Sequence, residues 1–114
     1  MANQFLELFT PNQVDNAAPE SLLTVPAGVA TTILRNGLVR FSNTTGTAAT
    51  IKCWAVPSGG SPTDANVCVP TRTIAANDYF DTAVPVISAG GKFYAQAGTA
   101  TAITATCLNG FYQS

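Results

Sequence analysis

The stretch GLVRFSNTTGTAATIKCWAVPSGGSPTDANVCVP, residues Gly37–Pro70, decides the fold class of this chain. Two segments in it, Leu38–Ser42 and Ala49–Val56, alternate apolar and polar residues on either side of a turn rich in Ser, Asn, Thr and Gly. A loop rich in Pro, Gly and Ser, Pro57–Asn66, then leads into a third apolar segment. A period of two bounded by turn residues is typical of half-buried antiparallel strands.

The same pattern continues from Ser21 to the end of the chain. Short apolar segments follow one another at close spacing, and turn-forming residues separate them. The segments with strand character are Leu22–Val25, Val29–Arg35, Leu38–Ser42, Ala49–Val56, Val67–Val69, Thr71–Ile74, Tyr79–Thr82, Val84–Ser88, Lys92–Gln96 and Ala102–Leu108. We therefore predict an all-β fold, an antiparallel β-sandwich or jelly-roll-like domain of about seven to nine short strands. Little or no helix is expected, at most one turn near Pro85–Ala89.

Two positions leave the strand boundaries open. Asn36-Gly37 is a strong hairpin signal, but it also suits a bulge within one long bent strand. Pro70 interrupts an apolar segment and marks an edge strand or a kink, because proline cannot donate a ladder hydrogen bond. Strand order cannot be read from the pattern.

With 114 residues, the chain is long enough for one domain with a single core. Residues 1–20 differ from residues 21–114, which we expect to form that β-sandwich domain. Phe5, Leu6, Leu8 and Phe9 make a short apolar patch before a polar segment with two prolines. This segment is either an edge strand of the sheet or an extended arm that docks on a neighbouring copy.

Charged residues make up only 10% of the chain, against about 25% in a typical soluble domain. The surface must therefore be covered largely by neutral polar residues, as in protein interfaces or in a Thr-rich β-protein. The five cations are spread along the whole chain and the net charge is −1, so we expect no nucleic-acid partner. No long apolar segment predicts a membrane span, and the N-terminus lacks secretory-signal features, so we expect synthesis and retention in the cytoplasm.

Catalytic and metal-binding chemistry is not expected. The chain has no His, which removes the commonest base and ligand. Asp78 and Asp81 are the close carboxylate pair, and we interpret Asp78 as a turn cap and Asp81 as solvent-facing rather than as a calcium or hydrolytic site. The three cysteines lack zinc or disulfide spacing, although a Cys53–Cys107 pair is geometrically possible. We predict no catalytic residue, no cofactor and no metal.

Aromatic residues are the remaining candidates for contact with a partner. Trp54 lies on the face of its strand opposite Ile51 and Cys53, so it is either exposed or covered by the following loop. Tyr79, Tyr94 and Tyr112 each stand beside a Phe, which turns one ring of each pair outward on a strand. The predicted interaction residues are Phe5, Leu6, Leu8, Phe9, Trp54, Tyr79, Tyr94 and Tyr112.

Several motifs in order suggest a family. They are TVPAG, VRFSNTTGTAATI, WAVPSGG, DANV, IAAND and SAGGKFYAQA, and the segment that they span covers about two-thirds of the chain. The pattern resembles a group of small β-sandwich structural proteins encoded among the virion genes of tailed bacteriophages. The resemblance implies a virion component that decorates or cements the capsid, and it implies no enzyme and no catalytic residues.

The expected function is therefore capsid decoration or cement. The expected partners are further copies of the chain, in a dimer or trimer, and the major capsid or other virion proteins. The chain would be made in the host cytoplasm and located in the virion. Two alternatives stay open: a tail, head–tail joining or fibre-attachment protein, and a carbohydrate-binding module that stacks sugars on Trp54 or on the tyrosines.

Overall fold

Nine β-strands and a single helical turn form the part of the chain that the computed structural model describes, residues 4–5 and 7–114. The strands are β1 (Gln4–Phe5), β2 (Asn12–Gln13), β3 (Glu20–Thr24), β4 (Ile33–Asn43), β5 (Ala49–Val56), β6 (Val67–Ile74), β7 (Tyr79–Val84), β8 (Lys92–Ala97) and β9 (Ile103–Gln113). The predicted all-β fold is confirmed, although β4 and β9, of 11 residues each, are longer than the short strands expected.

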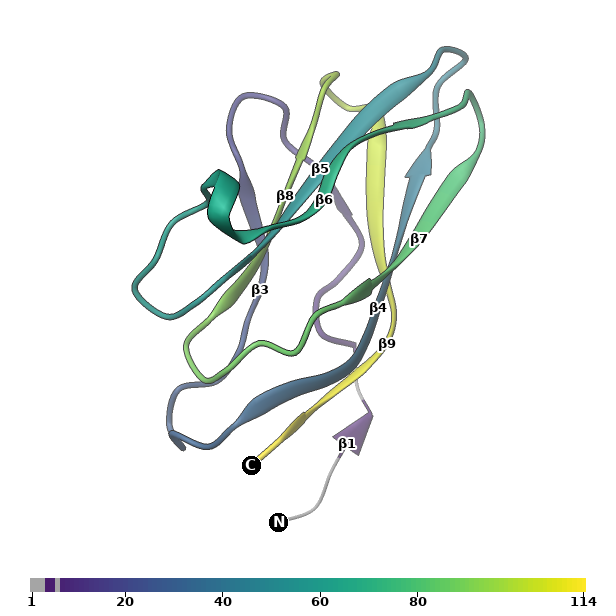
Figure 1. Ribbon diagram of the computed structural model, residues 1–114. Helices are drawn as coiled ribbons and strands as arrows, with labels where there is room; N and C mark the ends of the chain where they lie inside the picture. The colour runs from purple at the N-terminus through teal and green to yellow at the C-terminus, as the bar shows by residue number, and fades with distance from the viewer. Residues whose placement is uncertain (1–3, 6) are drawn as a thin grey trace.

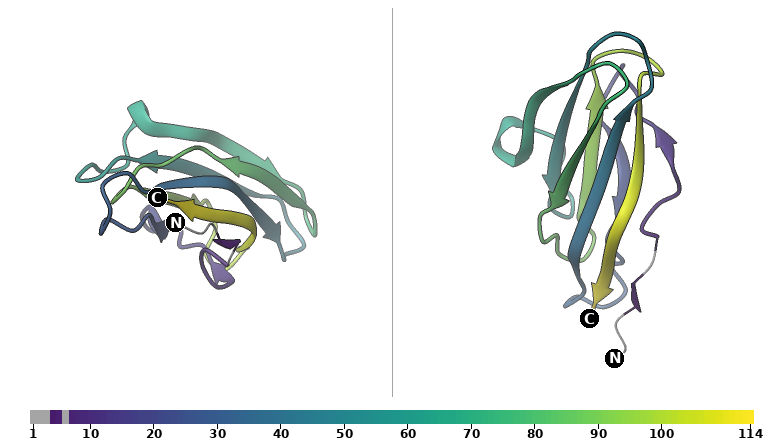
Figure 2. Two further views of the ribbon diagram at one scale, coloured as in Figure 1. Left: turned by 90° about the horizontal axis from the view of Figure 1, so that it is seen from below. Right: turned by 90° about the vertical axis from the view of Figure 1, so that its right-hand side faces the viewer.

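The strands form two sheets packed face to face (Figures 1 and 2). The first sheet has the order β1-β9-β4-β7 with β2 also paired to β9, and the second has the order β3-β8-β5-β6. The antiparallel pairs are nested along the chain: β2 with β9, β3 with β8, β4 with β7, and β5 with β6. This is one long hairpin rolled up until β4 also meets β9 and β5 also meets β8. The rolled hairpin is a jelly roll, as expected.

The hydrophobic core fills the space between the two sheets. In β5, Ile51 and Cys53 are buried while Lys52 between them is half-buried, so the predicted core face of this strand is confirmed. Phe41 of β4 and Phe93 of β8 are the largest fully buried side chains among the described residues. Burial of each such side chain contributes about 1.5–3 kcal/mol, and this layer is the main source of stability of the sandwich.

The Asn36-Gly37 signal marks a bulge, and the alternative prediction of a hairpin there is wrong. β4 continues through both residues, which together face one residue of β9 between the pairs Arg35↔Phe111 and Leu38↔Asn109. Asn36 has a φ of 54°, a left-handed conformation that Asn tolerates better than most residues. A second irregularity in β9 restores the register just beyond it. The two bulges bend a strand pair that a plain hairpin would have ended.

Asn43 fixes the corner at which the chain passes from β4 in the first sheet to β5 in the second. Its side chain is buried, and its amide nitrogen donates to the carbonyl oxygen of Thr47 at 2.8 Å. The same nitrogen donates to the carbonyl oxygens of Ile74 and Ala75, at 3.0 and 3.2 Å, in the opposite crossing from β6 to β7. Its Oδ1 accepts from the amide and hydroxyl of Thr45. One side chain therefore ties together both crossings at this end of the sandwich.

The described part of the N-terminal segment lies along the chain's own β9. β1 and β2 both pair with β9, and Leu8 and Phe9 pack against the core. Leu8 lies over Gly110, where a Cβ atom would be 2.6 Å from Leu8 Cδ1. These contacts match the edge-strand interpretation. Leu6 and the side chain of Phe5 lie outside the described residues, and docking of this segment on a neighbouring copy stays a prediction.

The helical turn is located in the loop after β5, and its predicted position was wrong. Segment Pro85–Ala89 forms no helical turn because its backbone pairs with the start of β4: Ile87 accepts a hydrogen bond from the Leu34 amide at 2.9 Å, and Ser88 bridges to Ile33 before a turn that includes Ala89. The turn η1 instead spans Asp64–Asn66 and is capped by Thr63. None of the helical structure described is long and apolar enough to cross a membrane.

Candidate interaction surfaces

Trp54 lies in the middle of the outer face of the second sheet and is covered. On β5 it pairs with Val67 of β6 and Tyr94 of β8, and it is only 6% exposed. Lys52 Nζ lies 5.3 Å from the centroid of the Trp54 ring and 3.9 Å from Asp64 of η1. Lys52, which also meets Asp64 of the loop after β5, therefore lies over the ring, and of the two interpretations of Trp54 the covered one is correct. An exposed Trp54 platform for sugar stacking is absent.

Tyr79 is exposed and belongs to a small ordered cluster on the outer face of the first sheet. Its side chain is on β7, with 54% of the residue exposed. Arg40 of the neighbouring β4 donates from Nε to Asp81 Oδ1 at 2.8 Å and from Nη2 to Asp81 Oδ2 at 2.9 Å. The Arg40 guanidinium carbon lies 4.0 Å from the Tyr79 ring centroid. One face of the exposed Tyr79 ring is therefore already in contact with a cation.

The acidic pair Asp78 and Asp81 is divided between two structural roles. Asp78 Oδ1 accepts from the Tyr79 amide at 2.8 Å, so it caps the turn as predicted. Asp81 lies on the outer, partly exposed face of the strand, where it forms a bidentate ion pair with Arg40 that was not predicted. The hydrogen bond from Arg40 holds the pKa of Asp81 below its ordinary value. The arrangement favours a structural ion pair over a pair of free carboxylates.

The tyrosines do not form one patch. Tyr94 and Tyr112 are half-buried and lie in different sheets. Tyr112 donates from its hydroxyl to the Thr24 carbonyl oxygen at 3.5 Å, and burial raises its pKa. Tyr79 pairs with Ser42, which on its other side faces Thr104, eight positions along β9 from Tyr112. At about 3.3 Å per residue, this separation is too large for a shared contact surface.

The cysteines are all free. Cys53 is buried, and Cys68 and Cys107 are half-buried, so the pairing of Cys53 with Cys107 that was considered possible is absent. Burial raises the pKa of the Cys53 thiol far above its ordinary value. Cys107 Sγ accepts a weak hydrogen bond from the Leu8 amide at 3.4 Å. Within residues 4–5 and 7–114 no group of three or more His, Cys, Asp or Glu side chains is placed to hold a metal ion.

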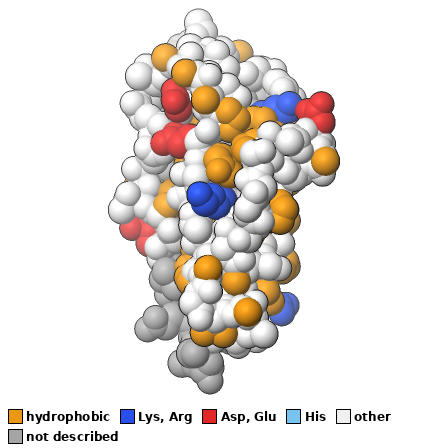
Figure 3. All heavy atoms as spheres, turned by 90° about the vertical axis from the view of Figure 1, so that its left-hand side faces the viewer, with side chains coloured by type: hydrophobic (Ala, Val, Ile, Leu, Met, Phe, Trp, Pro, Cys, Tyr) orange, Lys and Arg blue, Asp and Glu red, His pale blue; other side chains and the backbone are white. Residues whose placement is uncertain are grey.

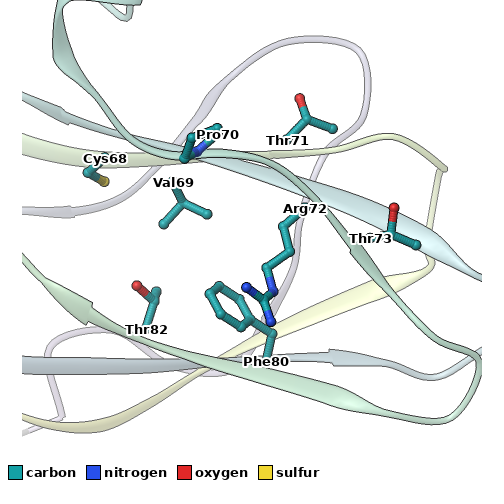
Figure 4. Close-up of a pocket in the computed structure, with 8 residues that line it drawn as sticks. All are labelled: Cys68, Val69, Pro70, Thr71, Arg72, Thr73, Phe80 and Thr82. Atoms are coloured by element: carbon teal, nitrogen blue, oxygen red, sulfur yellow. The ribbon is translucent and has the colours of Figure 1, made fainter.

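A groove between the edge strands β6 and β7 is a site that the sequence did not reveal. Its volume is about 550 Å³, and it lies where the two sheets open to solvent. Figure 4 shows Arg72 reaching across the groove to Phe80, while Val69 and Thr82 point into it. The lining residues are Cys68, Val69, Pro70, Thr71, Arg72 and Thr73 of β6 with Phe80 and Thr82 of β7. Pro70 correctly indicated that β6 is an edge strand, but the sequence pattern did not predict that β7 lies beside it.

Arg72 is the charged group of this groove. It pairs with Ile51, a core residue, so its side chain leaves β6 on the inner face of the sheet. Its guanidinium carbon lies 4.2 Å from the Phe80 ring centroid. The residues that the structure describes give its guanidinium neither a hydrogen-bond acceptor nor a carboxylate. The planar guanidinium of Arg72 therefore stacks on the Phe80 ring, and its N–H groups are available to bind an acceptor.

The rest of the visible surface carries few charges. Figure 3 shows one face of the molecule, on which Lys, Arg, Asp and Glu side chains are few and scattered among uncharged atoms. Two of the cations, Arg40 and Lys52, already face carboxylates. The free energy needed to desolvate a surface with so few charges is small.

The fold and these surfaces define the class of protein as a small jelly-roll domain. Comparison with known proteins adds no narrower class, since no protein family, curated protein or solved structure matches the chain.

Proposed function

We propose that this protein is a structural component of a virus particle, a decoration or cement protein that binds an assembled capsid shell by repeated protein–protein contacts. The observation that carries the proposal is the scarcity of charge on a well-packed sandwich. Lys, Arg, Asp and Glu together contribute 10% of the residues. Short neutral side chains lose less entropy and less hydration on binding than Lys and Glu, which interface cores avoid.

The architecture supports the same proposal. Jelly rolls occur in viral capsid and lectin domains, although a fold alone does not define a function. The motif order from TVPAG to SAGGKFYAQA resembles phage virion proteins of β-sandwich type. A shell offers the same binding surface many times, so a modest contact by each copy, linked in a dimer or trimer, gives strong retention through avidity.

The proposal is tested by counting copies of the chain in purified particles of the virus that encodes it. Isotope-labelled standard peptides and mass spectrometry give the copy number relative to the major shell protein. Decoration predicts on the order of hundreds of copies, one or more for each symmetry-related shell surface. About a dozen copies or fewer would assign the protein to the tail or the head–tail junction. Absence from the particle would overturn the proposal.

The carbohydrate alternative is tested separately with the free protein. Because Trp54 is covered, sugar stacking would have to use the tyrosines, of which Tyr79 is exposed and Tyr94 and Tyr112 are half-buried. A glycan array that is negative with wild-type protein removes this alternative. A positive array whose signal is lost in Tyr79→Ala would replace the decoration proposal with a lectin-like function.

A further inference from the structure

β7 is the regular, uncovered edge strand of the described sandwich. It pairs with β4 without a register shift from Gly37↔Val84 to Ser42↔Tyr79, and no described strand pairs with its other edge. The other edges are protected in ways that proteins commonly use. The opposite edge of the first sheet consists of β1 and β2, of only two residues each, a register shift interrupts β3, and two register shifts with Pro70 interrupt β6. β7 is therefore the edge most suited to accept an added strand.

A strand added to β7 would lie along the groove. Side chains of successive strand residues alternate between faces, so every second residue of the added strand would point inward, beside Phe80 and Thr82. Phe80 and Thr82 line the groove on the β7 side, and Val69 lines it on the β6 side. The groove thus offers these inward side chains a mixed lining of apolar, hydroxyl and guanidinium groups.

Arg72 gives the groove a preference for a negatively charged side chain. Its guanidinium stacks on Phe80 and has no carboxylate among the described residues. The nearest acidic residue on β7, Asp81, is engaged by Arg40 on the outer face of the first sheet. Among the described residues Arg72 therefore has no carboxylate partner, and a bound segment can supply one. Planar guanidinium groups bind carboxylates with two parallel hydrogen bonds.

We propose that the groove between β6 and β7 binds an extended segment of a partner protein, which adds a strand to β7 and places an Asp or Glu side chain against Arg72. A second copy of this chain that pairs its β7 with this β7 fits less well. In a symmetric pairing of β7 with β7, the inward positions are Phe80, Thr82 and Val84, which carry no charge. The inference rests on the proposed function only in naming the partner as a shell protein.

The test uses a displayed library of short random peptides, selected on the immobilised full-length protein. The probe is the fluorescein-labelled peptide that is enriched most, and its affinity is measured by fluorescence anisotropy. We expect enrichment of peptides with Asp or Glu between small or apolar alternate residues. Because charge-assisted hydrogen bonds contribute more than neutral ones, Arg72→Gln should weaken binding roughly 10-fold or more. The matched control Arg35→Gln removes the same charge from an exposed position on β4 and should leave affinity unchanged.

A second pair of variants keeps Arg72 in place. Thr82→Glu supplies a carboxylate from the opposite wall of the groove, and Thr82→Gln has nearly the same size without the charge. We expect Thr82→Glu to weaken binding of the acidic peptide more than Thr82→Gln does, because the new carboxylate pairs with Arg72 and repels the carboxylate of the peptide. Thermal unfolding of each variant confirms that it is folded before affinities are compared.

Three results would overturn the inference. The first is a selection without acidic enrichment, and the second is equal affinity for Arg72→Gln and Arg35→Gln. The third is a wild-type dimer in sedimentation velocity that Thr82→Glu dissociates, which would assign the groove to a second copy. Binding of the variants to particles separates the two proposals. A chain that is absent from particles refutes the proposed function only, whereas particle binding unaffected by Arg72→Gln refutes the groove as the shell contact.

Discussion

Replacement of Asn43 by alanine should destabilise the protein strongly, because this one side chain joins both sheet crossings at one end of the sandwich. It donates to the carbonyl oxygens of Thr47, Ile74 and Ala75 at 2.8 to 3.2 Å and is 2% exposed. A net hydrogen bond contributes about 1 kcal/mol, and a buried carbonyl left unsatisfied costs about 1–3 kcal/mol. We expect Asn43→Ala to lower the free energy of unfolding by about 3 kcal/mol and Tm by about 10–20 °C.

The assay is urea unfolding followed by far-UV circular dichroism, with Asn66→Ala as control. Asn66 also makes two side-chain hydrogen bonds, to the Thr63 amide and the Ser61 carbonyl, but in an exposed loop. The control should lose no more than about 1 kcal/mol. Equal losses in the two variants would refute the reasoning, because burial of the Asn43 network would then contribute nothing.

Asn43→Asp adds a pH-dependent test of the same network. The new carboxylate would face the carbonyl oxygens of Ile74 and Ala75, which favour its protonated form. Its pKa in the folded state should therefore lie above the unfolded value of about 3.9. A raised carboxyl pKa means that the native state binds more protons, so stability of this variant should fall as the pH rises above about 4. A stability that does not fall with pH would contradict the geometry.

Four further predictions concern single positions. Gly37→Ala should cost about 1–3 kcal/mol in urea unfolding, since its Cβ would lie 2.8 Å from a neighbouring Cβ, while Gly46→Ala, with open space around it, should be nearly neutral. The pKa of Asp81 is held low by its hydrogen bond from a guanidinium, so the wild-type protein should lose stability as the pH falls below about 4. Asp81→Asn should lose less stability over the same pH range, and parallel profiles of stability against pH would contradict this prediction. The buried Cys53 thiol should resist a thiol-specific reagent in the native state and react only in denaturant. Emission of the single tryptophan, Trp54, should be blue-shifted and poorly quenched by iodide, and strong quenching would show that the loop does not cover it.

Strand positions were predictable from the sequence because alternation reports which residues are half-buried. Ala49–Val56 was predicted with the boundaries it has as β5, and Lys92–Gln96 is one residue shorter than β8. The long strand β4 was not predicted as one unit, because an Asn-Gly pair suits a hairpin and a bulge equally well, and in the structure only Asn36 of the pair has a positive φ. Only the partner strand distinguishes them, and pairing is not a local property of the chain.

The candidate site was less predictable for the same reason. The groove combines Arg72 of β6 with Phe80 of β7, and their proximity depends on the rolled-up order of the sheets. Burial of Trp54 depends on the fold of the loop that follows it. The capping box between Thr63 and Asn66 in that loop was not predicted, because Asn66 stands where the motif usually has Glu or Gln. The direction in which the capped turn packs was not predictable from the pattern either.

The central claim is that this jelly roll binds a repeating shell through its β6–β7 edge. The most direct test is a cryo-electron microscopy reconstruction of particles that carry the protein, with the shell symmetry imposed. We predict density for the sandwich at repeated positions on the shell surface, with an extended shell segment running along β7 and a carboxylate next to Arg72. Sandwich density that contacts the shell through any other edge or face, or particles without it, would contradict the account.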